Sequence, residues 1–213
     1  MKYLHLLLLC LFFPLASSAN IWETQYKQIE QSIRQPEFAN KEFVITKYGA
    51  KPEAKAAVNQ KAINKAIATS TATASNSSVN LVIEEGATLQ FVFEPELYPI
   101  VPTRWEGIDC WNLSPCIYAY KATDIAITVK GTIDGGGNNN TWWPWCGAPR
   151  YGWKEGMVSQ RNGSRARLLK MAEDMVPRDE RRFTKEDGLR PQLVSPNLCD
   201  GVLIEGVKLL ASP

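Results

Sequence analysis

"NLVIEEGATLQ" (80–90) has the same pattern as "DIAITVKGTIDG" (124–135) and "DGVLIEGVKLL" (200–210). Each stretch starts with Asn or Asp, alternates apolar residues, has a glycine at a corner and then resumes with an apolar residue. Short strands that recur with glycine corners indicate coils stacked on one another. In such a stack each strand pairs in parallel with its neighbours at about 4.8 Å, and the inward apolar side chains form ladders. The sequence therefore predicts a solenoid of parallel β-coils, and the strand near the end of the chain is expected to have a further coil above it.

Around these stretches, the apolar periodicity predicts several other elements. The first is a short helix within 25–33 that Pro36 closes, and the second is a strand at 42–50 that runs into a glycine turn. An amphipathic helix at 58–67 follows, and then a polar loop without periodicity at 68–78.

The first residues are predicted to be a secretory leader. Lys2 precedes an apolar stretch, and small residues precede Asn20. This pattern is typical of a signal peptide over 1–19 and is too short for a membrane span. We therefore expect export to the periplasm or the extracellular space, with a single domain over 20–213 and no later membrane span.

The balance of charges argues against some classes of partner. The chain has 24 Lys and Arg against 22 Asp and Glu. Such a nearly neutral chain does not indicate a nucleic-acid partner or an anionic membrane surface.

Histidine is absent after the predicted leader, because the only histidine is His5. This excludes Ser-His-Asp and Cys-His catalysis and the usual zinc sites from 20–213. Acid–base chemistry there would depend on Asp, Glu, Lys or Tyr, and neither a metal nor a cofactor is predicted.

Four cysteines follow the predicted leader: Cys110, Cys116, Cys146 and Cys199. An even number permits two disulfides in an exported chain, whereas buried free thiols behave as small apolar residues. The spacing leaves both possibilities, and the pairing, open.

Seven segments, taken in order, resemble the N-terminal part of polygalacturonase-like enzymes of glycoside hydrolase family 28. They are "FVITKYGA", "AINKAI", "NLVIEEGATLQF", "TRWEGID", "GTIDGGG", "WWPW" and "LRPQLVSPNLCDGVLIEGVKLLASP". The resemblance begins near Lys41 and is strongest over 79–147 and 188–213. It implies an all-β, right-handed parallel β-helix with an N-terminal cap helix and a helical insertion near 150–190. It also implies hydrolysis of α-1,4-linked galacturonides in pectin, with inversion and without a cofactor.

Two departures from the family pattern are present. The loop at 68–78 replaces a glycine-rich strand region, so about one coil is expected to be missing. The family's catalytic motifs, an Asn-x-Asp turn, an Asp-Asp pair, a Gly-His-Gly turn and an Arg-x-Lys pair, do not occur in this chain. No catalytic residue is therefore assigned here, and the catalytic coils are expected beyond Pro213.

Five side chains are candidates for contact with an acidic polysaccharide such as pectin: Arg104, Glu106, Asp109, Trp145 and Arg150. Arg104 could bind a uronate carboxylate bidentately. A structural turn in which Arg104 pairs with Glu106 would explain the same residues. Asp134 and Asp200 each precede a glycine, so turn roles are favoured for them.

The other two candidates lie in segments of unusual composition. Trp145 belongs to an aromatic-rich segment (141–153), whose rings could stack on sugars or anchor the loop, and anchoring is favoured for most of them. Arg150 begins an arginine-rich segment (150–190). That segment is interpreted mainly as a solvated face, although its arginines could steer a polyanion. Within it, 164–176 predicts an amphipathic helix with five inward residues: Leu168, Leu169, Ala172, Met175 and Val176.

Three alternatives to hydrolysis remain. A non-catalytic module could bind acidic polysaccharide through the Trp and Arg loops. A pectate lyase would require an Asp cluster for calcium, which the sequence lacks. A purely structural solenoid would bind protein partners and no oligogalacturonate.

Overall fold

The computed structural model describes residues 21–73 and 78–213. The chain divides into two units after Gln35. The predicted leader, residues 1–19, lies outside the described residues. None of the described helices is both long enough and apolar enough to span a bilayer.

In the first unit, the described residues form one helix, α2 (Ile21–Ser32). The rings of Trp22 and Tyr26 lie one helical turn apart, with their centroids separated by 5.9 Å. The helix predicted within 25–33 is therefore confirmed, although it begins earlier.

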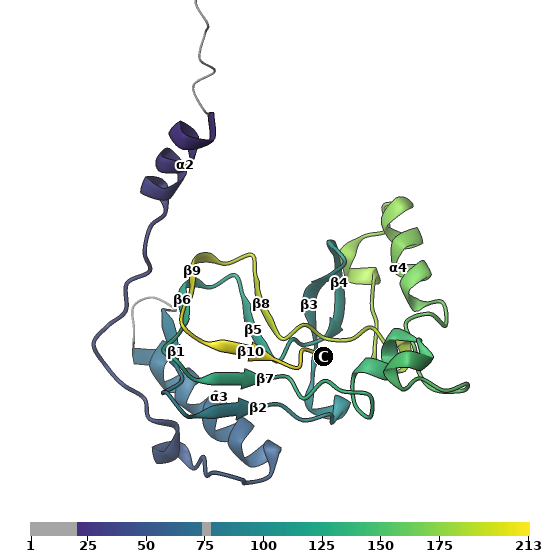
Figure 1. The fold of residues 1–213 in the computed structure, drawn as a ribbon, viewed down its shortest axis with the longest axis horizontal. Helices are drawn as coiled ribbons and strands as arrows, with labels where there is room; N and C mark the ends of the chain where they lie inside the picture. Colours follow the sequence, from purple (N-terminus) through teal and green to yellow (C-terminus); the bar gives the residue numbers. More distant parts are fainter. Residues whose placement is uncertain (1–20, 74–77) are drawn as a thin grey trace, which may run out of the picture. The chain divides into compact units, whose positions relative to one another are not determined.

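The second unit contains three successive coils of short strands (Figure 1). The first coil contains β1 and β2, the second β5, β6 and β7, and the third β8, β9 and β10. Their bounds are β1 Val79–Val82, β2 Thr88–Gln90, β5 Ile117–Tyr120, β6 Thr123–Thr128, β7 Thr132–Asp134, β8 Val194–Asn197, β9 Asp200–Ile204 and β10 Lys208–Leu210. The strands pair in parallel in the orders β1-β6-β9, β2-β7-β10 and β5-β8. The stacking predicted from the three similar stretches is therefore confirmed.

One apolar ladder runs through the coils. Leu89 pairs with Ile133, and Ile133 pairs with Leu209. The side chain of Ile133 is fully buried, whereas Leu209 in the third coil is 48% exposed. Ile133 belongs to a buried core of four residues: Ile83, Ile127, Ile133 and Leu193.

The strand predicted at 42–50 is wrong. A 3-10 helix, η2 (Ile45–Tyr48), occupies this stretch and ends at Gly49, whose φ is 105°. The turn is closed by two hydrogen bonds, in which the backbone N–H of Gly49 donates to the carbonyl of Thr46 and that of Ala50 donates to the carbonyl of Ile45. A strand needs a partner for its backbone groups, and no described strand pairs with this stretch. Only the glycine turn of the prediction is confirmed.

The helix predicted at 58–67 is confirmed and is longer than expected. It is α3 (Ala56–Thr73), and it contacts β1 of the first coil with Ala62 and Ala66 buried, as an N-terminal cap helix would. The loop predicted from residue 68 is therefore wrong as far as Thr73, and 74–77 lie outside the described residues. In the added turn, Thr69 Oγ1 donates to the carbonyl of Lys65 and Ser70 Oγ donates to that of Ile67.

An antiparallel hairpin interrupts the parallel arrangement. It joins β3 (Ile100–Trp105) to β4 (Ile108–Leu113) through a turn at Glu106 and Gly107. The all-parallel expectation is therefore incorrect for these two strands. The prediction missed the hairpin because Pro102 interrupts the strand pattern and Glu-Gly is a weak turn signal.

The chain between β7 and β8, residues 135–193, forms the insertion. Its helix α4 (Ser164–Glu173) confirms the helical insertion. Leu168 is buried as predicted, but Met175 is 84% exposed. The helix ends before Met175, whose φ is 53°, so the inward orientation predicted for this side chain is wrong. The short 3-10 helices of the remaining chain are η3 Pro95–Leu97, η4 Trp143–Cys146, η5 Pro149–Tyr151, η6 Arg178–Glu180 and η7 Lys185–Asp187.

All four described cysteines are free thiols in the structure. Burial raises the pKa of Cys110 and that of Cys116 to about 12. The structure therefore favours free thiols over disulfides, with Cys110 buried and the other three cysteines partly buried.

We expect Cys110 and Cys116 to resist alkylation in the native protein. The thiolate is the reactive species, and a pKa of about 12 in place of the ordinary 9.0 lowers the thiolate fraction at about pH 8 by roughly a thousandfold. Alkylation by iodoacetamide, located by peptide mass spectrometry before and after unfolding without reductant, measures this. All four cysteines should react after unfolding; any that stay unreactive would be disulfide-bonded, contrary to the structure.

Candidate functional site

A hollow of about 290 Å³ opens where the β3–β4 hairpin meets two parts of the insertion, one at Gln160 and the other just before β8. Residues from the end of the third coil complete its wall. Its lining residues are Trp105, Glu106, Gln160, Arg190, Pro191, Gln192, Ser212 and Pro213. The hollow is thus built from four segments that are distant in sequence.

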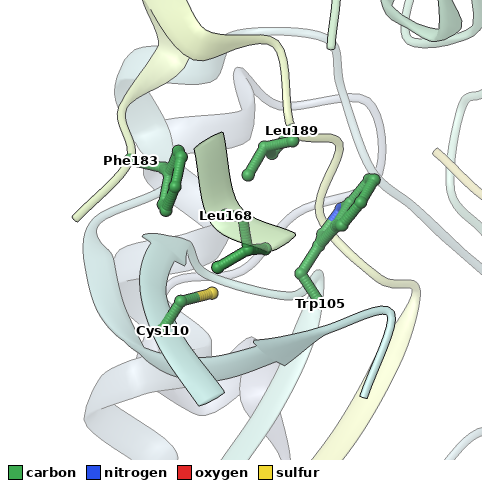
Figure 2. Packing of buried hydrophobic residues seen from close by; sticks show 5 residues of the cluster. All are labelled: Trp105, Cys110, Leu168, Phe183 and Leu189. Carbon is green, nitrogen blue, oxygen red and sulfur yellow. The ribbon is translucent and has the colours of Figure 1, made fainter. Parts of the chain in front are cut away.

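An apolar cluster fixes the hairpin against the insertion. Figure 2 shows Leu168 of α4 among the other members, Trp105, Cys110, Phe183 and Leu189. All five side chains are buried. Trp105 belongs both to this cluster and to the wall of the hollow. The packing of the cluster therefore fixes the position of this part of the wall.

Hydrogen bonds tie the hairpin to the insertion at several points. The indole Nε1 of Trp105 donates to the carbonyl of Arg190 at 3.2 Å. The backbone of Trp111 is bonded both to Arg181 and to Phe183. The Nδ2 of Asn112 donates to the carbonyl of Leu189 at 3.0 Å. These contacts hold Arg190 at a defined position beside the hairpin.

An electrostatic contact lies on the outer side of the same junction. The indole of Trp111 donates to the carboxylate of Asp179 at 3.0 Å, and Arg178 pairs with it at 3.0 Å. The hydrogen bonds from Trp111 and Arg178 lower the pKa of Asp179 below its usual value. Asp179 is therefore a structural carboxylate that remains ionised.

Arg104 and Asp109 form an ion pair at 3.0 Å. They lie directly opposite one another in the hairpin register, where oppositely charged side chains attract. The pairing of Arg104 with Glu106 that the turn interpretation predicted is therefore wrong. Glu106 instead pairs with Arg165 of α4 at 2.9 Å. The structure thus brings three of the predicted candidates together at the hairpin, but each of them already has an ionic partner.

Trp145 contributes to a second apolar core. It is 7% exposed and packs edge-to-face against Trp142 and Phe93. The anchoring interpretation therefore holds for Trp142 and Trp145.

Arg150 lies apart from the hairpin candidates. Its guanidinium lies 4.8 Å from the ring centroid of Tyr151, which is partly exposed. Elsewhere in the insertion, Arg165, Arg167 and Arg178 each pair with a carboxylate, as expected of a solvated face.

Asp134 and Asp200, the two aspartates for which turn roles were predicted, are not among the residues that line the hollow. The Oδ1 of Asp134 accepts the backbone N–H of Gly136 at 2.8 Å, which supports the predicted turn role. Asp200 is an exposed residue at the start of β9.

Arg190 was not predicted as a site residue. Its Nη1 donates to the carbonyl of Pro213 at 3.2 Å. Among the described residues, no Asp or Glu side chain forms an ion pair with it. In the sequence, Arg190 was noted only as one member of the arginine-rich segment (150–190), and the Arg-Pro pair at 190–191 does not indicate a cavity.

Glu106 is the one carboxylate among the residues that line the hollow. A glycoside hydrolase uses two carboxyl groups, and the residues that line the described hollow provide only one such side chain. Nor do the described residues contain a group of three or more His, Cys, Asp or Glu side chains that could hold a metal ion.

The comparisons with known proteins agree with this architecture. A crystal structure of a hyperthermoactive exopolygalacturonase from Thermotoga maritima matches with a TM-score of 0.83 and 32% sequence identity. The match covers 91% of this chain and 47% of the exopolygalacturonase, so the chain spans about half the length of that enzyme. No protein-family model matches the sequence, and no curated protein matches it significantly. The chain has a polygalacturonase-like fold.

Proposed function

We propose that the protein is a polygalacturonase-like glycoside hydrolase that cleaves α-1,4-linked galacturonides of pectin with inversion. The observation that carries the proposal is the similarity to an exopolygalacturonase over 91% of this chain at 32% identity. The 32% sequence identity is found in addition to the shared fold. The ordered motifs from "NLVIEEGATLQF" to "LRPQLVSPNLC" lie within the part of the chain that resembles the family.

The proposal includes a right-handed parallel β-helix as the complete architecture. Strand-for-strand pairing of β5, β6 and β7 with β8, β9 and β10 supports it. A parallel β-helix suits this chemistry, because equivalent positions on successive coils lie about 4.8 Å apart along one face. Inverting glycosidases need two carboxyl groups about 6.5–9.5 Å apart, a spacing that side chains from neighbouring coils can provide.

In this proposal the described residues bind substrate, and further coils supply the catalytic carboxyl groups. Two observations support this division. The chain lacks the family's catalytic motifs, and it spans 47% of the exopolygalacturonase. The ligand of the described part is an acidic polysaccharide, and the site of action is outside the cytoplasm, after removal of residues 1–19.

Binding without hydrolysis is the second candidate function. It is favoured by the hollow itself, where Glu106 is already paired with Arg165 and no second carboxylate lines the wall. Under this alternative the protein would retain oligogalacturonate without releasing products.

Intact mass and reducing-end release together test the proposal. We expect the protein as its source produces it to have a mass of about twice the 23.8 kDa calculated for this chain and to release reducing ends from polygalacturonate. Residues 20–213 alone should release none. A natural mass near that of residues 20–213, with no reducing ends released, would contradict hydrolysis and favour the binding module. Turnover by residues 20–213 that is lost in Glu106→Gln would contradict the proposed division.

A further inference from the structure

Met157 closes a compact loop of the insertion, residues 153–162. Its backbone N–H donates to the carbonyl of Lys154 at 3.1 Å. The carbonyl of Met157 accepts the indole N–H of Trp153 at 3.1 Å and the side-chain amide of Asn162 at 3.3 Å. Both ends of the loop are therefore bonded to this one residue.

The side chain of Met157 takes part in the same closure. Its Sδ accepts the backbone N–H of Lys154 at 3.2 Å. A thioether sulfur is a weak acceptor, so this bond is easily lost. Met157 is 37% exposed, and an oxidant in solution can therefore reach its side chain.

The later part of the loop fits closely against two glycines. A Cβ at Gly147 would lie 2.4 Å from Oγ of Ser159, and one at Gly188 would lie 2.8 Å from the carbonyl carbon of Ser159. Ser159 is 1% exposed, and the N–H of Gln160 is bonded to the backbone of η4 at 2.9 Å. Opening of the loop would therefore be confined to the part before Ser159.

Oxidation of the thioether would remove the contact between Met157 and Lys154. An electron pair of the sulfur attacks one oxygen of hydrogen peroxide, the O–O bond breaks, a proton passes to the departing oxygen, and water leaves. The product, methionine sulfoxide, is polar where the thioether is apolar. Because nitrogen and sulfur lie only 3.2 Å apart, no oxygen atom fits between them, and the side chain must withdraw from Lys154.

We propose that Met157 is a redox-sensitive latch of the loop at 153–162, which hydrogen peroxide opens by converting Met157 to its sulfoxide. This inference is independent of the proposed function, because the latch concerns the loop alone. The chain continues from the latch to Gln160 in the wall of the hollow, so the latch lies beside the candidate site.

Limited trypsin digestion of the full-length protein, before and after treatment with hydrogen peroxide, measures the opening. Lys154 is exposed within the loop, and cleavage at such a site follows the population of locally open protein. We expect peptide mass spectrometry to find Met157 oxidised. Cleavage after Lys154 should become about fivefold to tenfold faster, as the loss of one hydrogen bond would give. Cleavage after Lys130, which is exposed at the corner between β6 and β7, should not change.

Three variants assign the response to Met157. Met175 is 84% exposed and is oxidised as well, but Met175→Leu should leave the response to peroxide intact. Met157→Leu keeps an apolar side chain that cannot be oxidised, so its cleavage should not respond. Met157→Gln has a polar side chain of similar length and should be cleaved rapidly without peroxide. Thermal unfolding of each variant shows whether the fold is retained, and Met157→Gln provides the test if Met157→Leu does not fold.

Several results would overturn the latch. Oxidised Met157 with unchanged cleavage after Lys154 would show that the thioether does not hold the loop. Met157 that stays reduced while Met175 is oxidised would show that peroxide does not reach it. A response that persists in Met157→Leu would assign the effect to another residue, and an equal acceleration after Lys130 would indicate general unfolding.

Discussion

Replacing Leu168 with alanine should lower the free energy of unfolding by about 3 kcal/mol. Leu168 is fully buried, and Figure 2 shows its side chain among Trp105, Cys110, Phe183 and Leu189. Truncation removes apolar contacts with all of these neighbours and leaves a cavity that a close-packed cluster fills only partly. Chemical denaturation of the native protein and of Leu168→Ala measures the difference.

Leu198→Ala is the matched control for this prediction. Leu198 is 65% exposed, so the same truncation should change the free energy of unfolding by less than about 0.5 kcal/mol. Similar losses in the two variants would show that α4 does not pack on the hairpin as described. The comparison matters for function, because the cluster that contains Leu168 also holds Trp105 in the wall of the hollow.

Local patterns in the sequence predicted the coils because their signal is contained within each strand. The alternation around Ile133 indicated an inward side chain, and the register with Leu89 and Leu209 confirms it. The stretch at 42–50 has a similar alternation but forms η2. Alternation alone does not provide a neighbouring strand. Because no described strand pairs with this stretch, its backbone N–H and carbonyl groups form hydrogen bonds with one another in a tight turn.

The hollow could not be predicted in the same way. Glu106, Gln160, Arg190 and Ser212 come together only when the hairpin, the insertion and the third coil have folded. Arg104 resembled a binding residue because it lies among aromatic and acidic residues in the sequence. Its true partner, Asp109, is determined by the antiparallel register of a hairpin that the pattern did not reveal.

Replacing Gly131 with alanine should destabilise the protein by about 3 kcal/mol. A Cβ at this position would lie 2.2 Å from Cγ2 of Ile83 and 2.6 Å from its carbonyl oxygen, with the carbonyl oxygen of Glu84 at 2.8 Å. The approach is close because the N–H of Gly131 donates to the carbonyl of Ile83 at 2.9 Å. Relief of the overlap would therefore require the corners of the first and second coils to move apart, which the buried ladder beside them opposes. Denaturation curves of the variant measure the loss.

Gly86→Ala distinguishes this steric effect from backbone strain. A Cβ added at Gly86 would meet no atom within 4 Å, but the φ there is +83°, so alanine should cost only the left-handed conformation, about 1–2 kcal/mol. Gly131 does not adopt a left-handed φ, and its cost is a matter of space alone. In the Ile83→Ala background, Gly131→Ala should cost nearly as much as in the native protein, because two of the three close atoms are backbone oxygens. If Gly131→Ala cost nothing in that background, only the side chain of Ile83 would be in the way, and the backbones of the two coils would not approach as closely at this corner as the structure shows.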